Sequence, residues 1–416
     1  MRTIVQKFGG SSVADAERIR RCAQRAYDTA RAGNRVVVVV SAMGKTTDGL
    51  LDLAHQLSQR PAKREVDQLL SAGEQVSIAL TAIALHELGV EAVSLTGAQC
   101  GLRTDSFYTR ARIESIDTNR VNGHLDSGKI VVVAGFQGIN PDGDTTTLGR
   151  GGSDTSAVAL AAALKSDECE IFTDVTGVYT ADPRVVPDAR KLDRISYEEM
   201  FELASLGAKV MAARAMFVGM KFGVPIHVRH AMLPERGTLI TQETREMEAD
   251  VVTGVALKQN IGRVTITKIP SGAGFDAKLF AAIAHAGIMV DDIIQNQLAD
   301  GSRNLTFTTD HGDLGDVKPV VERTISACAS ESGEKWGGTL SVDVGLARVS
   351  AVGVGMRTQS GVAARMFGAL ANAQGSPVNV QNITTSEIKI ACIVAKEDGE
   401  RAMRAVHEAF GLAKGN

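Results

Sequence analysis

The sequence predicts a layered α/β protein in which a mostly parallel sheet is covered by helices and is followed by two smaller, related units. Short apolar runs alternate with helical segments through the first half of the chain, which is typical of a parallel sheet. One segment of the second half occurs twice. The chain of 416 residues is also too long for one ordinary hydrophobic core, so we expect two or three domains.

The first half contains the elements of the predicted sheet. Val36–Val40 is a continuous β-branched run, as expected of a strand that is buried on both faces. A helix is predicted over Glu74–Leu88 and ends at Gly89. Another is predicted over Asp15–Ala32, with an apolar face made by Ile19, Cys22, Ala23 and Ala26. The other predicted strands are Thr3–Lys7, Glu91–Leu95, Ile130–Ala134, Cys169–Thr173 and Val224–Val228.

The repeat lies beyond a polar segment, Thr238–Asp250, which predicts a domain boundary. Gly274–Gly287 aligns with Gly361–Gln374 with six identities at one constant offset. Each copy follows a β-rich run and precedes an extended segment that contains Gln-Asn. Two copies of one βαβ-type unit therefore form a pseudo-symmetric pair and not a solenoid.

Composition excludes several classes of protein. The net charge of -3 argues against non-specific binding of nucleic acid. The five cysteines are scattered, so free thiols in a reducing cytosol are expected in place of disulfides or a zinc site. The first residues contain no long apolar stretch, so a secretory leader is not expected, and no run approaches the roughly 20 apolar residues that span a bilayer. We therefore expect a cytoplasmic protein without a membrane partner.

The first candidate site is Lys7-Phe8-Gly9-Gly10-Ser11-Ser12, where a strand gives way to a helix. The glycines allow close approach of a ligand to the backbone, successive N–H groups bind anions, and Lys7 adds a point charge for a phosphoryl group. The alternative is a purely structural turn. A P-loop ending at Gly44-Lys45-Thr46 is excluded because Val39 stands where its first glycine belongs.

A second candidate, Gly149-Arg150-Gly151-Gly152-Ser153-Asp154, precedes an Ala-rich helix over Ala157–Leu164. Arg150 at a helix N-terminus suits a carboxylate that is held by two hydrogen bonds. The alternative is that Ser153, Asp154 or Thr155 simply caps the helix.

A third candidate, Thr173–Arg184, follows a predicted strand and carries Gly177 and an Asp-Pro turn. Open α/β sheets bind ligands at the carboxyl ends of their strands, so this loop can hold a nucleotide. The alternative is a connecting loop without a ligand.

Together these three motifs resemble those of the aspartokinases, within the amino-acid kinase superfamily, and the repeat is similar to the tandem ACT domains of that family. The resemblance covers essentially the whole chain. It implies a three-layer α/β/α kinase domain over 1–245, then ferredoxin-like (βαββαβ) ACT domains over 263–340 and 346–416, with a strand near 251–260 able to pack with the second. It also implies transfer of the ATP γ-phosphoryl group to the β-carboxylate of L-aspartate, with ATP and Mg²⁺ as cofactors.

The resemblance assigns a role to each motif position. Lys7 and Asp154 are the expected catalytic residues: Lys7 bridges the two reacting groups and Asp154 positions it. Arg150 is expected to bind the α-carboxylate of aspartate, and Glu74 its α-ammonium group. The remaining substrate-binding candidates are Ser41, Thr47, Gly151, Gly152 and Ser153. The ATP-binding candidates are Lys7, Phe8, Gly9, Gly10, Thr173, Asp174, Tyr179, Asp182, Arg184, Lys209 and Val210. No protein ligand to a metal is assigned.

The chemistry suits these residue types. A carboxylate is already a nucleophile, so catalysis needs mainly in-line positioning and neutralisation of phosphate charge.

The ACT pair implies regulation. The resemblance implies feedback inhibition by lysine, threonine or both, and a homodimer that forms through the ACT domains. A shorter partner chain could start at Met200, Met211, Met216 or Met220. The candidate effector-binding residues are Asp276, Gln295, Asn296, Asn379, Ser386 and Glu387.

Two competing functions remain open. The first is another superfamily kinase that acts on N-acetylglutamate, glutamate or a nucleoside monophosphate. The second is a sensor of amino acids that has lost turnover. Glu74 and the ACT pair argue against the first, and intact Lys7, Arg150 and Asp154 argue against the second.

Overall fold

The structure is a computed structural model, and it describes all residues except 209, 244–250, 270–273, 333–336 and 414–416. The internal contacts of the chain define two units. The first comprises Met1–Thr180 and Ala189–Thr253, and the second comprises Ala181–Asp188 and Gly254–Asn416.

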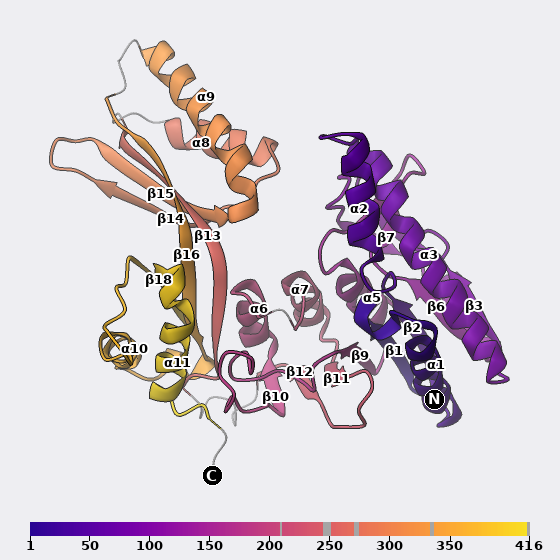
Figure 1. Ribbon diagram of the computed structural model, residues 1–416. Helices are drawn as coiled ribbons and strands as arrows, with labels where there is room; N and C mark the ends of the chain where they lie inside the picture. Colours follow the sequence, from indigo (N-terminus) through magenta and orange to yellow (C-terminus); the bar gives the residue numbers. More distant parts are fainter. Residues whose placement is uncertain (209, 244–250, 270–273, 333–336, 414–416) are drawn as a thin grey trace. The chain divides into compact units, whose positions relative to one another are not determined.

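An eight-stranded sheet organises the first unit, in the order β10-β12-β11-β9-β1-β2-β6-β3 (Figure 1). All neighbouring strands are parallel except β11 and β12. The mostly parallel sheet is therefore confirmed. The strands are β1 (Thr3–Phe8), β2 (Arg35–Val40), β3 (Ala92–Leu95), β6 (Ile130–Ala134), β9 (Glu168–Thr173), β10 (Arg194–Ser196), β11 (Ile226–His230) and β12 (Thr238–Thr241).

The predicted strands differ from the observed ones mainly at β11. We predicted Val224–Val228, but the strand begins at Ile226. Pro225 has no N–H to donate to a ladder, and its carbonyl accepts from the N–H of Cys169 as the strand starts. The strand then continues to His230, beside Thr173 of β9.

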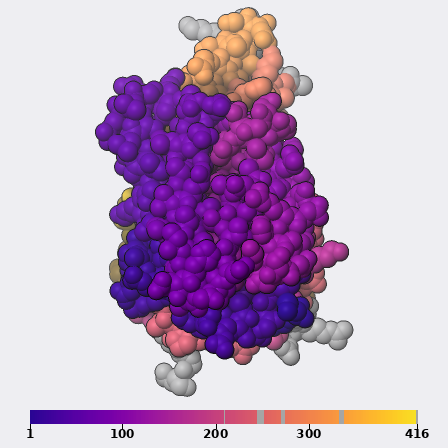
Figure 2. All heavy atoms as spheres, turned by 90° about the vertical axis from the view of Figure 1, so that its right-hand side faces the viewer, coloured from indigo at the N-terminus to yellow at the C-terminus, as the bar shows by residue number. Residues whose placement is uncertain are grey.

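Helices cover both faces of this sheet (Figure 1). Val36, Val38 and Val40 of β2 pack with helices α1 and α3 on one face, while α5 contacts β1, β2 and β9. The predicted apolar face of the first helix is confirmed, because its four residues are the buried ones of α1. Figure 2 shows a continuous surface made by the first half of the chain, coloured indigo to purple. The helices are α1 (Ala16–Arg31), α2 (Thr46–Leu57), α3 (Lys63–Glu87), α4 (Asn119–Asp126), α5 (Gly152–Ala163), α6 (Tyr197–Ser205) and α7 (Ala213–Phe222).

Helix α3 is longer than predicted, because it begins at Lys63 and not at Glu74. Buried Asp67 and Ser71 interrupt its apolar pattern, so the first turns escape a search for periodicity. By length and composition α3 could cross a membrane, but half of its most apolar stretch is buried in the protein. Core helices satisfy the same test, and α3 packs on α1 and on strands β3 and β6.

A small four-stranded sheet, in the order β5-β4-β7-β8, completes the first unit. Its strands have only three or four residues each, too short for a periodic pattern, and none was predicted. The last of them leads directly to the Gly149–Gly152 loop. The strands are β4 (Leu102–Thr104), β5 (Ile113–Ile116), β7 (Gln137–Ile139) and β8 (Thr145–Thr147).

The second unit contains a six-stranded antiparallel sheet in the order β14-β15-β13-β16-β18-β17. The repeated helices predicted from the sequence are α8 and α10, and each follows a glycine with positive φ, Gly274 or Gly361. The elements are β13 (Gly254–Ile269), α8 (Phe275–His285), β14 (Asp291–Gln297), β15 (Arg303–Asp310), α9 (Leu314–Ser332), β16 (Leu340–Val352), α10 (Val362–Ala371), β17 (Asn382–Ser386), β18 (Lys389–Ala395) and α11 (Gly399–Ala409).

Strands β13 and β16 each serve both repeats. The second half of β13 pairs with β15, and its first half, from Gly254 to Gln259, pairs with Ala347–Val352 of β16. That part of β16 pairs in turn with β18. Each repeat therefore has the βαββαβ composition of a ferredoxin-like fold, but the last strand of the second repeat precedes the first repeat in the chain.

A buried arginine joins the two repeats where their strands meet. Arg348 of β16 is only 2% exposed. Its Nη1 lies 2.6 Å from Asp291 Oδ2, and its Nη2 donates to Thr308 Oγ1 at 3.0 Å and pairs with Asp292. Both aspartates begin β14 of the first repeat, so one side chain of the second repeat neutralises two carboxylates of the first.

We expect Arg348→Ala to lower the free energy of unfolding by about 3–5 kcal/mol, because the variant leaves Asp292 without its counter-ion in a buried place. Urea denaturation of the full chain, followed by circular dichroism, measures this change. Lys278→Ala removes an exposed ion pair with Glu331 in the same unit and should change the stability far less. Equal effects of the two variants would contradict the interpretation of Arg348.

Candidate active site

A buried ion pair lies where strand β1 ends and helix α5 begins. Lys7 Nζ is 2.6 Å from Asp154 Oδ1, and the two side chains are only 11% and 13% exposed. Lys7 lies on β1, between β2 and β9, and Asp154 lies in the first turn of α5. Because a lone buried charge is costly, each residue fixes the position of the other. The ammonium group is thus held at the carboxyl edge of the sheet.

Gly9 and Gly10 bring the backbone close to this ion pair. A Cβ atom at Gly9 would lie 3.4 Å from Lys7 Nζ. A Cβ at Gly10 would lie 2.9 Å from the carbonyl oxygen of Ala42, and Gly10 accepts a hydrogen bond from the N–H of Gly44. The loops after β1 and β2 therefore pack together, and a side chain at either glycine would crowd the site.

Glu74 approaches the same loops from helix α3. The residue is 2% exposed, and its Oε1 accepts from the N–H of Ala42 at 3.0 Å. Its Oε2 is buried and has no hydrogen-bond partner in the part of the chain that the structure describes. Burial raises the pKa of this carboxyl group to about 7, against the stabilising hydrogen bond from Ala42. A cationic ligand group at Oε2 would supply the missing partner.

The loop that carries Arg150 depends on glycine. Gly149 and Gly151 have φ angles of 78° and 70°, in the left-handed region that favours glycine. A Cβ at Gly151 would also lie 2.4 Å from that of Ala212. Arg150 is exposed at the tip, and among the described residues its guanidinium forms no hydrogen bond or ion pair. It is thus free to bind an anion.

The capping alternative for this loop is wrong. The N-cap of α5 is Gly151, and no side chain caps the helix. Asp154 instead turns to Lys7, and Ser153 is buried, with its Oγ 2.9 Å from where a Cβ at Gly135 would lie. The polar residues of the motif are therefore used for contacts other than capping.

These contacts place several predicted residues together. Lys7 joins Gly9 and Asp154, and Ala42 joins Gly10 to Glu74. Ser41 lies beside Ala42 and donates its N–H to the carbonyl of Phe8. Thr47 lies half-buried in the first turn of α2.

Comparison with known proteins shows the family to which this chain belongs. A model of the amino acid kinase family matches residues 2–230, and a model of the ACT domain matches residues 349–410. The aspartokinase of Geobacillus stearothermophilus is 49% identical over 414 residues, covering 100% of this chain and 98% of that protein. The aspartokinase of Pseudomonas aeruginosa is 47% identical, with 99% and 98% covered.

The chain belongs to the aspartokinase family. It is therefore an enzyme, a kinase with a kinase domain and an ACT region. Two crystal structures of E. coli aspartokinase III, each 26% identical in sequence, are similar to this structure. The similarity covers 98% of this chain and 99% of the E. coli chain. The complex with aspartate and ADP (R-state) has a TM-score of 0.83, and the complex with lysine and aspartate (T-state) has 0.73.

The candidate nucleotide residues form local pairs and not one cluster. Thr173 ends β9 and donates its hydroxyl to Asp174 at 3.1 Å, while the Tyr179 hydroxyl lies 2.6 Å from that of Thr176. Asp182 and Arg184 form an ion pair of 2.7 Å within the segment that belongs to the second unit. Lys209 lies outside the described residues, and Val210 beside it is half-buried.

Two charged residues near this site were missed. Asp67 of α3 accepts hydrogen bonds from Thr109 and Thr147, and Arg214 of α7 donates to two backbone carbonyls next to the Gly149–Gly152 loop. The only sequence indication for Asp67 is an acidic residue on the apolar face of a helix. Arg214 is likewise a lone charge in the apolar run before β11.

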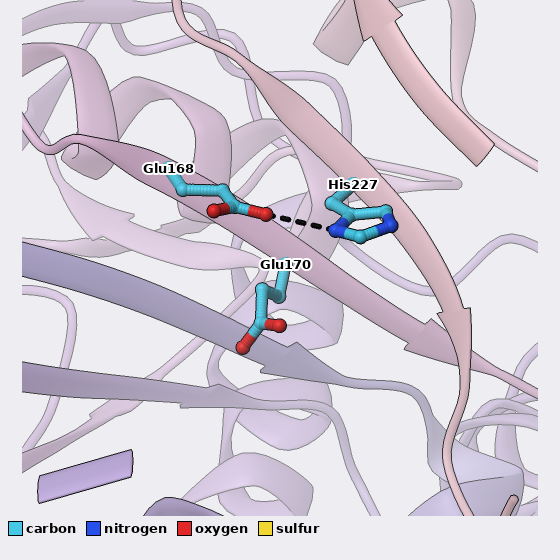
Figure 3. A group of neighbouring side chains, drawn as sticks. All are labelled: Glu168, Glu170 and His227. Atoms are coloured by element: carbon cyan, nitrogen blue, oxygen red, sulfur yellow. Dashed lines mark hydrogen bonds and ion pairs between the residues drawn. The ribbon is translucent and has the colours of Figure 1, made fainter. Parts of the chain in front are cut away.

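A group of possible metal ligands lies elsewhere on the sheet (Figure 3). Glu168 and Glu170 of β9 and His227 of β11 place one ligand atom each within 4.8 Å of one another. His227 Nδ1 bonds to Glu168 at 2.8 Å, and Arg229 lies 2.5 Å from Glu170. Arg229 already supplies the positive charge that a metal ion would bring, so we assign no metal to this group.

The candidate effector residues fall in two places of the second unit. Arg303, which we did not predict, joins two of them: its Nη1 donates to Asp276 at 2.7 Å and to Gln295 at 2.9 Å. Ser386 and Glu387 line a hollow of about 650 Å³ near the start of α10. Asn296 and Asn379 are exposed outside both groups.

The unpaired carboxyl group of Glu74 predicts a pH-dependent stability. Because the folded-state pKa is raised from 4.5 to about 7, the unfolded chain ionises first as pH rises. Stability should therefore fall by up to about 3 kcal/mol between these pH values and stay level above them. Glu74→Gln should remove this fall, as measured by urea denaturation at a series of pH values.

The control is Glu65→Gln, on the same helix and in an exposed ion pair with Arg64. This variant should keep the pH dependence of the wild type. A Glu74→Gln variant that still lost stability across this window would assign the pH dependence to another group.

Proposed function

We propose that the chain transfers the γ-phosphoryl group of ATP to the β-carboxylate of L-aspartate, giving 4-phospho-L-aspartate and ADP. The carboxylate oxygen attacks the phosphorus, the bond to the bridging oxygen of ADP breaks, and no proton needs to move. The observation that carries this proposal is the buried Lys7–Asp154 pair beside the two glycines, with the unpartnered Glu74 oxygen close to the same loops. A relative that binds aspartate and ADP supports it.

Lys7 acts on the charge that develops on the transferred group. Its ammonium group is fixed by Asp154 before substrates bind, so little reorganisation accompanies the reaction. The N–H group of Gly10 contacts the phosphates, and Gly9, whose own N–H donates to the carbonyl of Phe172, lets them approach the backbone. The nucleotide is held by Phe8, Thr173, Asp174, Tyr179, Asp182, Arg184, Lys209 and Val210.

Arg150 and Glu74 distinguish an α-amino acid from acids that lack a free α-ammonium group. The free guanidinium of Arg150 binds the α-carboxylate, and Glu74 Oε2 accepts from the α-ammonium group, which lowers the pKa of Glu74 on binding. Ser41, Thr47, Gly151, Gly152 and Ser153 complete the pocket. A ligand without the α-ammonium group leaves Glu74 without a partner, which selects against N-acetylated acids.

Magnesium is expected with ATP. Mg²⁺ usually keeps waters and binds substrate phosphates with one or two carboxylates. Asp154 is occupied by Lys7, whereas Asp174 is exposed at the end of β9, so this donor set fits an ion held chiefly by the nucleotide. Bound Mg²⁺ would neutralise phosphate charge.

Regulation is proposed for the second unit. Lysine, threonine or both inhibit the reaction through the ACT domains, which span 263–340 and 346–416, with 251–260 packing on the second and the kinase domain over 1–245. A relative that binds lysine and aspartate supports this proposal. The reaction then begins lysine, threonine and methionine biosynthesis in the cytoplasm, in a homodimer formed through the ACT domains, with or without a shorter chain.

The first test is ADP release from ATP and magnesium with L-aspartate, L-glutamate or N-acetyl-L-glutamate. We expect turnover with aspartate alone. Lys7→Ala should reduce it roughly a thousandfold, because the charge on the transferred group loses its main stabilising contact. Lys63→Ala, at the exposed start of α3, is the control and should remain active.

Turnover with another acid would overturn the substrate. A folded wild-type protein without turnover that still binds lysine or threonine would favour an amino-acid sensor.

Feedback inhibition can be tested at Arg303. The Arg303→Met variant frees Asp276 and Gln295 from their shared partner, so we expect the lysine or threonine concentration for half-inhibition to change by at least about tenfold. Uninhibited turnover should stay the same. Asp300→Ala, in an exposed turn, is the matched control. A wild-type enzyme that is indifferent to both amino acids would refute the proposal.

A further inference from the structure

Two charged side chains, the fully buried Asp67 and the half-buried Arg214, hold the loop that carries Arg150. Asp67 reaches it from α3 and Arg214 from α7. Among the described residues neither side chain forms an ion pair. Both form hydrogen bonds to backbone groups at the base of this loop, and Asp67 also accepts one from a hydroxyl group. A buried charge without a counter-ion is costly, so these contacts call for an explanation beyond stability.

Asp67 fixes Thr147, two residues before the loop. It is fully buried, with its Oδ2 accepting the N–H of Thr147 at 2.9 Å and its Oδ1 accepting the Thr147 hydroxyl at 2.6 Å. Burial raises the pKa of the carboxyl group, although these hydrogen bonds act against the rise. Thr147 is thus held through both its backbone and its side chain, three residues before Arg150.

Asp67 also stabilises a strained residue that touches the loop. Its Oδ2 accepts the N–H of Thr109, whose φ of 68° is costly for a β-branched side chain. A Cβ atom at Gly149 would lie 3.0 Å from the carbonyl oxygen of Thr109. Gly149 therefore packs directly against the backbone of this strained turn.

Arg214 fixes the other side. Its Nη1 donates to the carbonyl of Leu148 at 3.0 Å and its Nη2 to that of Ala111 at 2.7 Å. The N–H of Ala111 donates in turn to the carbonyl of Thr147. Asp67, Thr147, Ala111 and Arg214 thus form one hydrogen-bonded chain across the base of the loop.

We propose that Asp67 and Arg214 are positioning residues, which hold the Gly149–Gly152 loop so that Arg150 meets the α-carboxylate of L-aspartate. The inference rests on the proposed function. The guanidinium of Arg150 is exposed and has no partner among the described residues, and the fixed backbone at its base limits where it can reach. Pre-organisation of this kind lowers the cost of ordering a clamp on binding.

The test is a double-mutant cycle with Arg150, in full-length enzyme. We expect Asp67→Ala and Arg214→Met each to raise the KM for L-aspartate at least about tenfold, with the KM for ATP changed less than about twofold. In an Arg150→Met background the same changes should raise it less than about twofold further, because the clamp is already absent. The conservative variant Asp67→Asn keeps an oxygen that accepts from both N–H groups, so its KM for L-aspartate should equal that of the wild type.

The matched control is Asp144→Asn. Asp144 lies just before β8, and its side chain accepts hydrogen bonds from Arg64 and Tyr108 and none from the Arg150 loop. The KM of this variant for aspartate should therefore equal that of the wild type. Since Asp67→Ala leaves two N–H groups without an acceptor and can fail to fold, Arg214→Met carries the same test independently.

The outcomes separate the two proposals. If Arg150→Met itself leaves the KM for aspartate unchanged, the substrate clamp of the proposed function fails, and this inference fails with it. If Arg150→Met raises the KM but Arg214→Met does not, or if its effect multiplies in full with that of Arg150→Met, only the positioning role is overturned.

Discussion

The buried contact between Lys7 and Asp154 constrains the rest of the kinase unit. An ammonium group at the end of a strand with apolar neighbours needs an anion beside it, and that anion comes from the first turn of α5. Strand β1 must therefore lie at the centre of the sheet, with β9 and β2 on either side and α5 across it. The loops after β1 and β2 then meet at one edge, where their glycines leave room for a ligand.

Around this contact, unfavourable local arrangements are held in place by their surroundings. Glu74 is buried with one oxygen unpaired, and Thr109 has a left-handed backbone despite its branched side chain. Phe136, with φ of 72°, packs against Gly152 on the other side of the Arg150 loop. Strain and unpaired polar atoms of this kind concentrate at sites that bind ligands, because the missing interactions are completed only when the ligand binds.

The sequence predicts the large sheet well and its connections poorly. Runs such as Val36–Val40 identify buried strands because both faces of the sheet are apolar. The small sheet escaped prediction because strands of three residues have no periodicity. Lys7 and Asp154 were paired by family resemblance, and the structure shows the contact. Asp67, Arg214 and Arg303 were missed because their partners are backbone groups or lie far along the chain. The capping alternative is wrong because a left-handed glycine occupies the N-cap position.

The interleaved strands of the second unit have a genetic consequence. In the second repeat, the edge strand that pairs with β16 consists of residues Gly254–Gln259. These residues precede every residue of the first repeat in the chain. A gene cut between the repeats would therefore leave one protein with a surplus strand and another with an open sheet edge, exposed to association with other chains. The two repeats can be inherited, exchanged or expressed apart from the kinase unit only as one indivisible block.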